Sequence, residues 1–207
     1  MRTVPITAIV IIVATAYALI RYIVFQGVAV DHLPLYVLNK VASFAGIVLI
    51  GFAPWLKDSQ QRKQMGLVAF NLIIAHVAMS WIMMNPAYYS KLFEAAGKLN
   101  WRGEVSMLTG VVALVMMLWL YRVTPLANAR KDDKPSPPND VQPAAVKRRR
   151  GLVPGLGRLV LLFTALHVFF MGYTTWLDVS SWPGYLPPIT LLSFVIGIGF
   201  VVSRMLR

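Results

Sequence analysis

Cysteine is absent from the 207 residues of this chain, and charged residues make up only 14% of it. The lack of thiols excludes iron–sulfur clusters, thiolate-ligated haem, covalently attached c-type haem and disulfides. A soluble domain carries about 25% charged residues, whereas this chain is 57% hydrophobic and has a mean hydropathy of +0.64. The composition therefore predicts an integral membrane protein, and any redox cofactor in it must be held without a bond to cysteine.

Acidic residues are scarce as well, since eight Asp and Glu stand against 20 Lys and Arg and leave a net charge of +12. Such a charge can favour nucleic acid, but seven of the basic residues lie in one segment, 130–150, and most others flank apolar runs. That distribution is typical of membrane topology signals and of contact with anionic lipid headgroups. We expect membrane lipids as partners and no binding of nucleic acid.

Six apolar runs are long enough to cross a hydrocarbon core about 30 Å thick, which takes about 20 helical residues. Prolines, which end helices, stand near the ends of these runs. We predict an all-α membrane protein, a single domain over residues 1–207 forming a six-transmembrane-helix bundle, with the first run retained as a helix and not cleaved as a signal. The predicted spans are Val4–Val28, Leu35–Leu56, Met65–Met84, Val105–Val123, Val153–Trp176 and Pro187–Met205.

The two ends of such a bundle differ in their basic residues. With six spans, both termini and the second and fourth connections share one side, which holds 15 Lys and Arg against five on the other. The positive-inside rule then places both termini in the cytoplasm, and we expect the bacterial inner (cytoplasmic) membrane. Residues 126–150, rich in Pro, Asp and Lys, are predicted to form a flexible basic cytoplasmic linker. A short amphipathic helix is predicted in the third connection, from the helical spacing of Tyr88, Leu92, Phe93, Ala96 and Leu99.

Two of the three histidines lie inside apolar runs. His76 is 11 residues beyond Met65 and His167 is 11 residues beyond Leu156, so each lies about 16 Å deep at 1.5 Å per residue, close to the middle of the core. Ionisable side chains at this depth are costly and mark functional sites. Two imidazoles at equal depth on parallel helices are suited to bind the iron of one porphyrin from opposite sides. Zinc or copper would need further ligands, and no Asp or Glu lies at that depth.

Other residues are expected to surround this cofactor. A threonine or a backbone carbonyl would accept the second N–H of each imidazole. Arg158 would bind an inward-facing propionate or a quinone headgroup, and Lys40 or Arg21 an outward-facing propionate, although snorkelling explains the last two equally well. His32 is interpreted as an interfacial loop residue, or otherwise as a contact for an external acceptor or metal ion. The side chains expected beside the porphyrin, from their helical spacing to the histidines, are Met79, Phe163, Thr164, Phe170 and Met171.

Four stretches of the sequence resemble segments of one family. They are AGIVLIGFAPWL, RKQMGLVAFNLIIAH ending in His76, KLNWRGEVSMLTG, and GRLVLLFTALHVFF around His167. Over about residues 35–205 the chain resembles the ferric reductase-like transmembrane family, most closely its MsrQ (YedZ) branch of haem b membrane subunits. The resemblance implies one haem b ligated by His76 and His167. It also implies electron transfer across the membrane from a quinol or a cytosolic flavin reductase to an external acceptor, which in that branch is a periplasmic methionine sulfoxide reductase.

The chain departs from the two-haem members of that family. Those relatives carry further histidines about 13–14 residues from the first on each helix, and no side chain at these positions here can replace an imidazole. One bis-His haem is therefore the most that the chain can hold, and a flavin or a quinone would have to come from a partner or from the membrane. The positions in question hold Arg62, Ser90, Pro154 and Ser180.

Three functional hypotheses follow. The first is a membrane haem b electron-transfer protein that passes electrons from a cytoplasmic or quinol donor to an acceptor on the external side, together with a partner redox protein or within a larger membrane complex. Whether such a chain is an enzyme or an oxidoreductase subunit stays open. The second is a haem-free structural or assembly subunit of a larger membrane complex, whose histidines bond between helices. The third, a transporter or proton relay, is disfavoured because the spans contain no buried carboxylates and no visibly broken helices.

Overall fold

The computed structural model describes residues 3–28, 33–132 and 144–206, and over these ranges the chain is helical, without a β-sheet. Six helices in the described ranges are long and apolar enough to cross a membrane, which confirms the predicted all-α bundle. A short helix, α4 (Pro86–Tyr89), lies between the third and fourth of them. The long helices are α1 (Thr3–Ala18, continued by π-helical turns over Leu19–Phe25), α2 (Leu38–Phe52, preceded by π-helical turns over Leu33–Val37), α3 (Ser59–Ile82), α5 (Trp101–Asp132), α6 (Ala144–Gly172) and α7 (Ile189–Met205).

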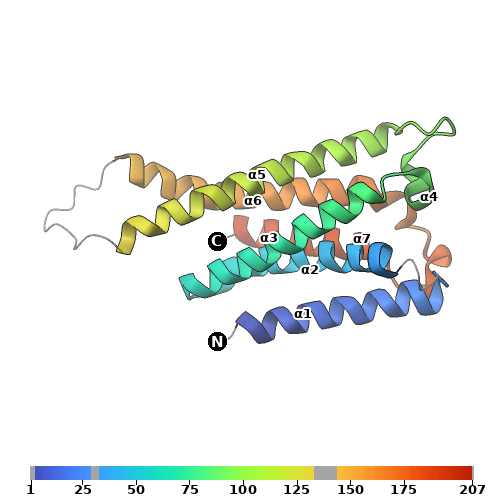
Figure 1. Ribbon diagram of the computed structural model, residues 1–207, viewed down its shortest axis with the longest axis horizontal. Coiled ribbons are helices and arrows are strands. Elements are labelled where there is room, and N and C mark those ends of the chain that lie inside the picture. Colours follow the sequence, from blue (N-terminus) through green and yellow to red (C-terminus); the bar gives the residue numbers. More distant parts are fainter. Residues whose placement is uncertain (1–2, 29–32, 133–143, 207) are drawn as a thin grey trace, which may run out of the picture.

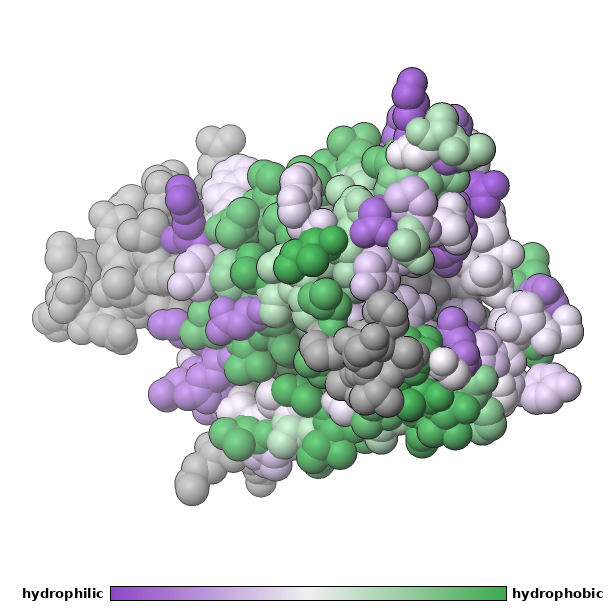
Figure 2. Space-filling model, turned by 45° about the vertical axis from the view of Figure 1, so that its right-hand side comes forward, coloured by the Kyte–Doolittle hydropathy of each residue, from purple (hydrophilic) through white to green (hydrophobic). Residues whose placement is uncertain are grey.

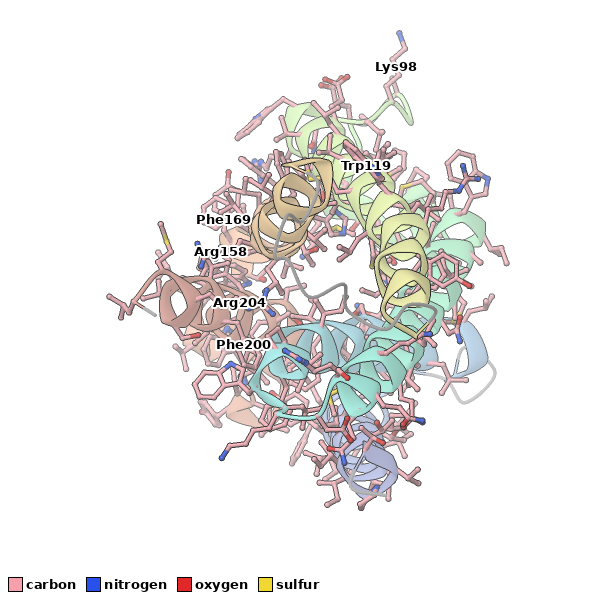
Figure 3. The ribbon with its side chains drawn as sticks, turned by 90° about the vertical axis from the view of Figure 1, so that its left-hand side faces the viewer. Lys98, Trp119, Arg158, Phe169, Phe200 and Arg204 are labelled. Carbon is pink, nitrogen blue, oxygen red and sulfur yellow. The ribbon has the colours of Figure 1, made fainter. Side chains whose placement is uncertain are left out.

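Successive long helices run in opposite directions along the bundle, and the two marked chain ends therefore lie at the same end of it (Figure 1). We call the opposite end, formed by residues 83–100 and 173–188, the distal end. Helix α2 packs along both α3 and α7, and α6 packs along both α5 and α7. In the view along the bundle, α1 lies outside the ring formed by the other five long helices (Figure 3).

The flank of the bundle is apolar. Figure 2 shows apolar side chains covering the middle of the molecule and hydrophilic residues gathering toward its ends. Large aliphatic side chains are exposed along several helices, among them Ile12 of α1, Val111 of α5 and Val195 of α7. Helices that satisfy their own backbone hydrogen bonds and expose aliphatic side chains are suited to lipid, so the chain is an integral membrane protein.

Polar caps set where two of the spans begin. The Asp58 carboxylate accepts from the backbone N–H of Gln60 at 2.9 Å, so α3 begins at Ser59, before the apolar run starts. The Asn100 side chain likewise accepts from the backbone N–H of Gly103 at 3.0 Å, at the start of α5. Caps of this kind satisfy backbone donors that have no partner in the first helical turn.

The structure differs from the sequence prediction in two connections. Of the predicted linker 126–150, residues 126–132 continue α5 and 144–150 begin α6, because alanine, lysine and arginine are good helix formers; residues 133–143 lie outside the described residues. The amphipathic helix predicted over residues 88–99 is wrong. After α4 and one 3₁₀ turn the chain reverses at Gly97, whose φ is 75°, and Phe93 pairs with Leu99 in an antiparallel bridge.

Candidate functional site

A cavity of about 320 Å³ lies within the bundle and is lined by α2, α3, α5, α6 and the beginning of α7. Its lining is mostly apolar, with a small number of polar side chains that include His76 and His167. Cavities of this kind, about 300–1,000 Å³ in volume, are typical of cofactor and small-molecule sites. The two intramembrane histidines therefore share one cavity.

The two imidazoles lie close together across this cavity. Their ring centroids are 6.5 Å apart, and the ring planes make an angle of 71°. A metal–imidazole bond is about 2.0 Å long and the ring centroid lies ~1.1 Å behind the nitrogen, so two imidazoles bound to opposite sides of one metal ion have centroids ~6 Å apart. Rotation of a ring about its metal–nitrogen bond leaves this distance unchanged. The separation of His76 and His167 thus fits one shared metal ion.

A side chain from the neighbouring helix holds His76. Its Nδ1 lies 2.6 Å from Oδ1 of Asn39 on α2, and Asn39 is 2% exposed. Asn39 in turn donates through Nδ2 to the hydroxyls of Ser80 and Tyr89, each at 3.1 Å. Because an amide oxygen accepts hydrogen bonds, Nδ1 of His76 carries the proton and Nε2 keeps its lone pair.

The backbone of α5 holds His167 in the same way. Its Nδ1 lies 2.8 Å from the carbonyl oxygen of Ser106, and the Ser106 hydroxyl donates to the His167 carbonyl at 3.2 Å. The ring also lies against Gly110, where an added Cβ would come within 2.8 Å of Nδ1. Only glycine at position 110 leaves room for this ring, and the carbonyl acceptor again leaves Nε2 with the lone pair.

Both histidines are therefore held in the tautomer that a metal ligand needs. Histidines that bind metal almost always donate their other ring N–H to an oxygen acceptor, which fixes the ring and raises its basicity. The hydrogen bonds described above for both rings are made through Nδ1. Groups of three or more His, Cys, Asp or Glu are also absent from the described residues. The pair thus suits a metal that brings its other ligands with it, as iron in a porphyrin does.

The two histidines lie at similar distances from the distal ends of α3 and α6, and their depth in a membrane stays a prediction. Six residues of α3 follow His76 and five of α6 follow His167, which places both about 8–9 Å from the distal ends of their helices. The prediction counted from the start of each apolar run and placed the histidines near the middle of the core. In the structure α3 begins at Ser59, so an apolar run does not mark the first residue of its helix.

The other residues predicted around the cofactor divide into two groups. Lys40, Thr164 and Met171 line the cavity, and the Thr164 hydroxyl donates to the carbonyl of Val160 within its own helix at 2.7 Å. Four others are not among the residues that line it. They are Met79, which packs against the cluster around Met83; Phe170, whose ring centroid is 6.1 Å from that of Trp101; Phe163; and Arg158, which lies near Arg204 on α7 (Figure 3).

A backbone carbonyl accepts from His167, as the sequence analysis expected, but sequence reasoning did not name the residues that hold the imidazoles, namely Asn39, Ser106 and Gly110. Asn39 carried a usable signal, because it is the only asparagine in the second apolar run, and a polar amide within a span is retained where it has a hydrogen-bond partner. Ser106 acts mainly through its backbone, which no sequence pattern marks.

No protein-family model matches this chain, and no curated protein matches it either. The resemblance to the ferric reductase-like transmembrane family thus rests on the four sequence stretches alone and stays a prediction. The geometry of the cavity is an independent basis for considering function.

Proposed function

We propose that this chain is a membrane haem b electron-transfer protein in which His76 and His167 would hold the iron of a single haem. The observation that carries the proposal is the 6.5 Å separation of the two imidazole centroids across one cavity. Such a haem supplies an iron that exchanges one electron between the ferric and ferrous states. The resemblance to the ferric reductase-like family supports the same cofactor.

The residues around the cavity would orient and protect this group. Asn39 and the Ser106 carbonyl keep each imidazole in one tautomer and one orientation. Apolar side chains along the cavity, Met171 among them, limit access of water, which together with the hydrogen bonds to the imidazoles sets the redox potential of a bound iron. The polypeptide thereby contributes ligation, orientation and tuning.

We further propose that the protein lies in the bacterial inner membrane with both termini in the cytoplasm, because the end of the bundle that carries the termini also carries most of the basic residues. The distal end would then face outward. The histidines lie nearer that end, which suits delivery of electrons to an external acceptor. The donor would be a quinol or a cytoplasmic reductase, so a partner redox protein or a larger membrane complex is part of this proposal.

A haem-free structural or assembly subunit is the second candidate, and one observation favours it. Each histidine already bonds to a neighbouring helix, His76 to α2 and His167 to α5, and bonds of this kind hold helices together without any cofactor. This role would leave both Nε2 atoms without a function, which is why we rank it second.

An absorption spectrum distinguishes the two candidates. Protein purified from haem-replete cells should show low-spin b-type bands that shift and sharpen on reduction with dithionite, and His76→Ala or His167→Ala alone should abolish them. His32→Ala is the matched control and should leave the spectrum intact; His32 lies outside the described residues. A colourless wild-type preparation would favour the haem-free subunit, and full retention of the bands in His76→Ala or His167→Ala would refute the ligand assignment.

A further inference from the structure

A second cavity, of about 230 Å³, adjoins the first at the distal end. Tyr36, Lys40, Lys91 and Thr190 line both cavities, so the two lie side by side and share part of their lining. We call the second one the distal basic cavity, because three cations line it: Arg21, Lys40 and Lys91. None of the described residues that line it is acidic. Cations that gather without a counter-charge are costly, and an anion bound among them lowers that cost.

Arg21 lacks a partner for one of its donors. Its side chain is only 5% exposed, and its Nη1 donates to the backbone carbonyl of Leu186. The buried Nε has no hydrogen-bond partner in the described part of the chain. Arg21 belongs to the π-helical turns that continue α1, and such turns often occur at functional sites. A buried guanidinium donor without a partner is costly and rare, so an acceptor in the cavity would complete its hydrogen bonds.

Lys40 is held at the boundary between the two cavities. Its Nζ lies 4.4 Å from the ring centroid of Tyr36 and 5.2 Å from that of Tyr22. The two tyrosine rings pack edge to face, with centroids 5.5 Å apart. Cation–π contacts position an ammonium without using all of its N–H donors, so Lys40 can still donate to an anion.

Lys91 brings a third positive charge toward Lys40. Desolvation, and to a smaller extent the charge of Lys40, lower the pKa of Lys91 to about 8. The direction shows that the surroundings of Lys91 disfavour its ammonium form. A bound anion would reverse this effect, because opposite charge favours the protonated lysine.

We propose that the distal basic cavity is a carboxylate site formed by Arg21, Lys40 and Lys91. A carboxylate matches the chemistry of the cavity, because its two oxygens accept several charge-assisted hydrogen bonds and neutralise one charge. The carboxylate has two sources: an acidic arm of the cofactor in the first cavity, which rests on the proposed function, or a small free carboxylate that enters from the distal side. The lining that the two cavities share favours the first source, because it places Lys40 and Lys91 beside both of them.

The first arm of the test concerns the cofactor's own carboxylates. Resonance Raman spectra of the holoprotein are recorded for wild type, for the double variant Lys40→Met with Lys91→Met, and for Lys98→Met. Lys98 is the control because it lies in the same connection as Lys91 but projects away from the bundle (Figure 3). The double variant should shift the haem propionate bending band while its low-spin spectrum persists, and Lys98→Met should leave the band unchanged.

The second arm tests a free carboxylate. Sodium acetate is titrated at constant ionic strength and tryptophan fluorescence is followed, since Trp182 lines the distal basic cavity. A free-carboxylate site should give a saturable response in wild type and in Lys98→Met. Loss of two cationic donors should weaken it roughly tenfold or more in the double variant. If the double variant does not fold, as judged by circular dichroism, Lys91→Met alone takes its place, because Lys91 lies in the short turn Ser90–Leu92 and not in one of the long helices.

A shift of the propionate band or a saturable acetate response that depends on the lysines supports the carboxylate site and identifies its source. Absence of both overturns it. If the wild-type protein contains no haem, the proposed function fails, and the acetate titration alone then decides whether the carboxylate site exists.

Discussion

If His76 and His167 hold a haem, as we propose, replacing Asn39 with leucine should loosen that haem without removing either histidine. Asn39 accepts from Nδ1 of His76 at 2.6 Å and is almost fully buried. Leucine branches at Cγ as asparagine does but has no polar atom, so His76 loses the acceptor that fixes its tautomer. His76 would then populate the tautomer with the proton on Nε2, which cannot bind iron.

The size of the effect follows from the role of such acceptors. Loss of a hydrogen-bond partner behind a ligating histidine typically weakens metal binding about 10–100-fold, or about 1.4–2.7 kcal/mol. The hydroxyls of Ser80 and Tyr89 also lose their donor at 3.1 Å, and each lost bond costs about 1 kcal/mol of folding stability. A lowered unfolding temperature should therefore accompany the loss of haem affinity.

Haem transfer to an excess of apomyoglobin measures this affinity as a rate. The Asn39→Leu variant should release haem about 10–100 times faster than wild type. Asn71→Leu is the matched control, because Asn71 lies on the same helix as His76 but its side chain is exposed on the flank. Release at the wild-type rate from Asn39→Leu, with an unchanged spectrum, would refute the claim that Asn39 orients His76.

Three further predictions concern the other ligand and the distal basic cavity. Ser106→Ala should change the rate of haem release less than about threefold, because the backbone carbonyl that accepts from His167 remains. Gly110→Ala should abolish or broaden the low-spin bands, since its Cβ would lie 2.8 Å from Nδ1 of His167. Carboxylate binding should weaken as the pH rises through about 8, where Lys91 loses its proton, and Lys91→Met should remove that dependence of acetate affinity or of the propionate band on pH.

The glycine prediction has a control within the same bundle. Gly66 lies on α3, and a Cβ added there would meet no atom within 4 Å, so Gly66→Ala should keep the wild-type spectrum. Equal spectra for Gly66→Ala and Gly110→Ala would mean that His167 tolerates displacement. A pH profile of carboxylate binding that is the same in wild type and in Lys91→Met would remove Lys91 from the site.

The number and order of the spans could be predicted because the length of an apolar run is a direct physical requirement of the membrane. The ends of the helices were less accessible to sequence reasoning. Helix α3 begins at Ser59 with polar residues, and Asp58 caps its first turn. A hydropathy plot does not detect a polar first turn of this kind. The chain after α4 reverses at Gly97, which adopts a positive φ. The apolar spacing of that segment indicated a helix instead and gave no sign of this reversal.

The histidine pair could be predicted because an imidazole in a span is rare and costly, but its surroundings could not. Whether Met79 or Phe170 faces the same cavity as the histidines depends on the rotation of each helix about its axis. Helical spacing leaves that rotation open by tens of degrees. Asn39 is marked in the sequence as the only asparagine of its apolar run, but its pairing with His76 and the role of Ser106 became recognisable only when the neighbours of each histidine helix were known.

Each histidine helix is held by the helix that precedes it in the chain, α3 by α2 and α6 by α5. The two helix pairs differ in the kind of acceptor that they offer to the histidine. The acceptor for His76 is a side chain and can be lost by a single substitution, whereas the acceptor for His167 is a backbone carbonyl that any residue at position 106 supplies.

The tautomer of His167 therefore persists when residue 106 is replaced, while the position of its ring depends on the room that Gly110 leaves. The tautomer of His76 is adjustable, because exchange of Asn39 for a stronger or weaker acceptor would change the basicity of that ligand alone. If the proposed haem is present, the α2–α3 pair is thus the place where a substitution would change its redox potential while both histidines remain.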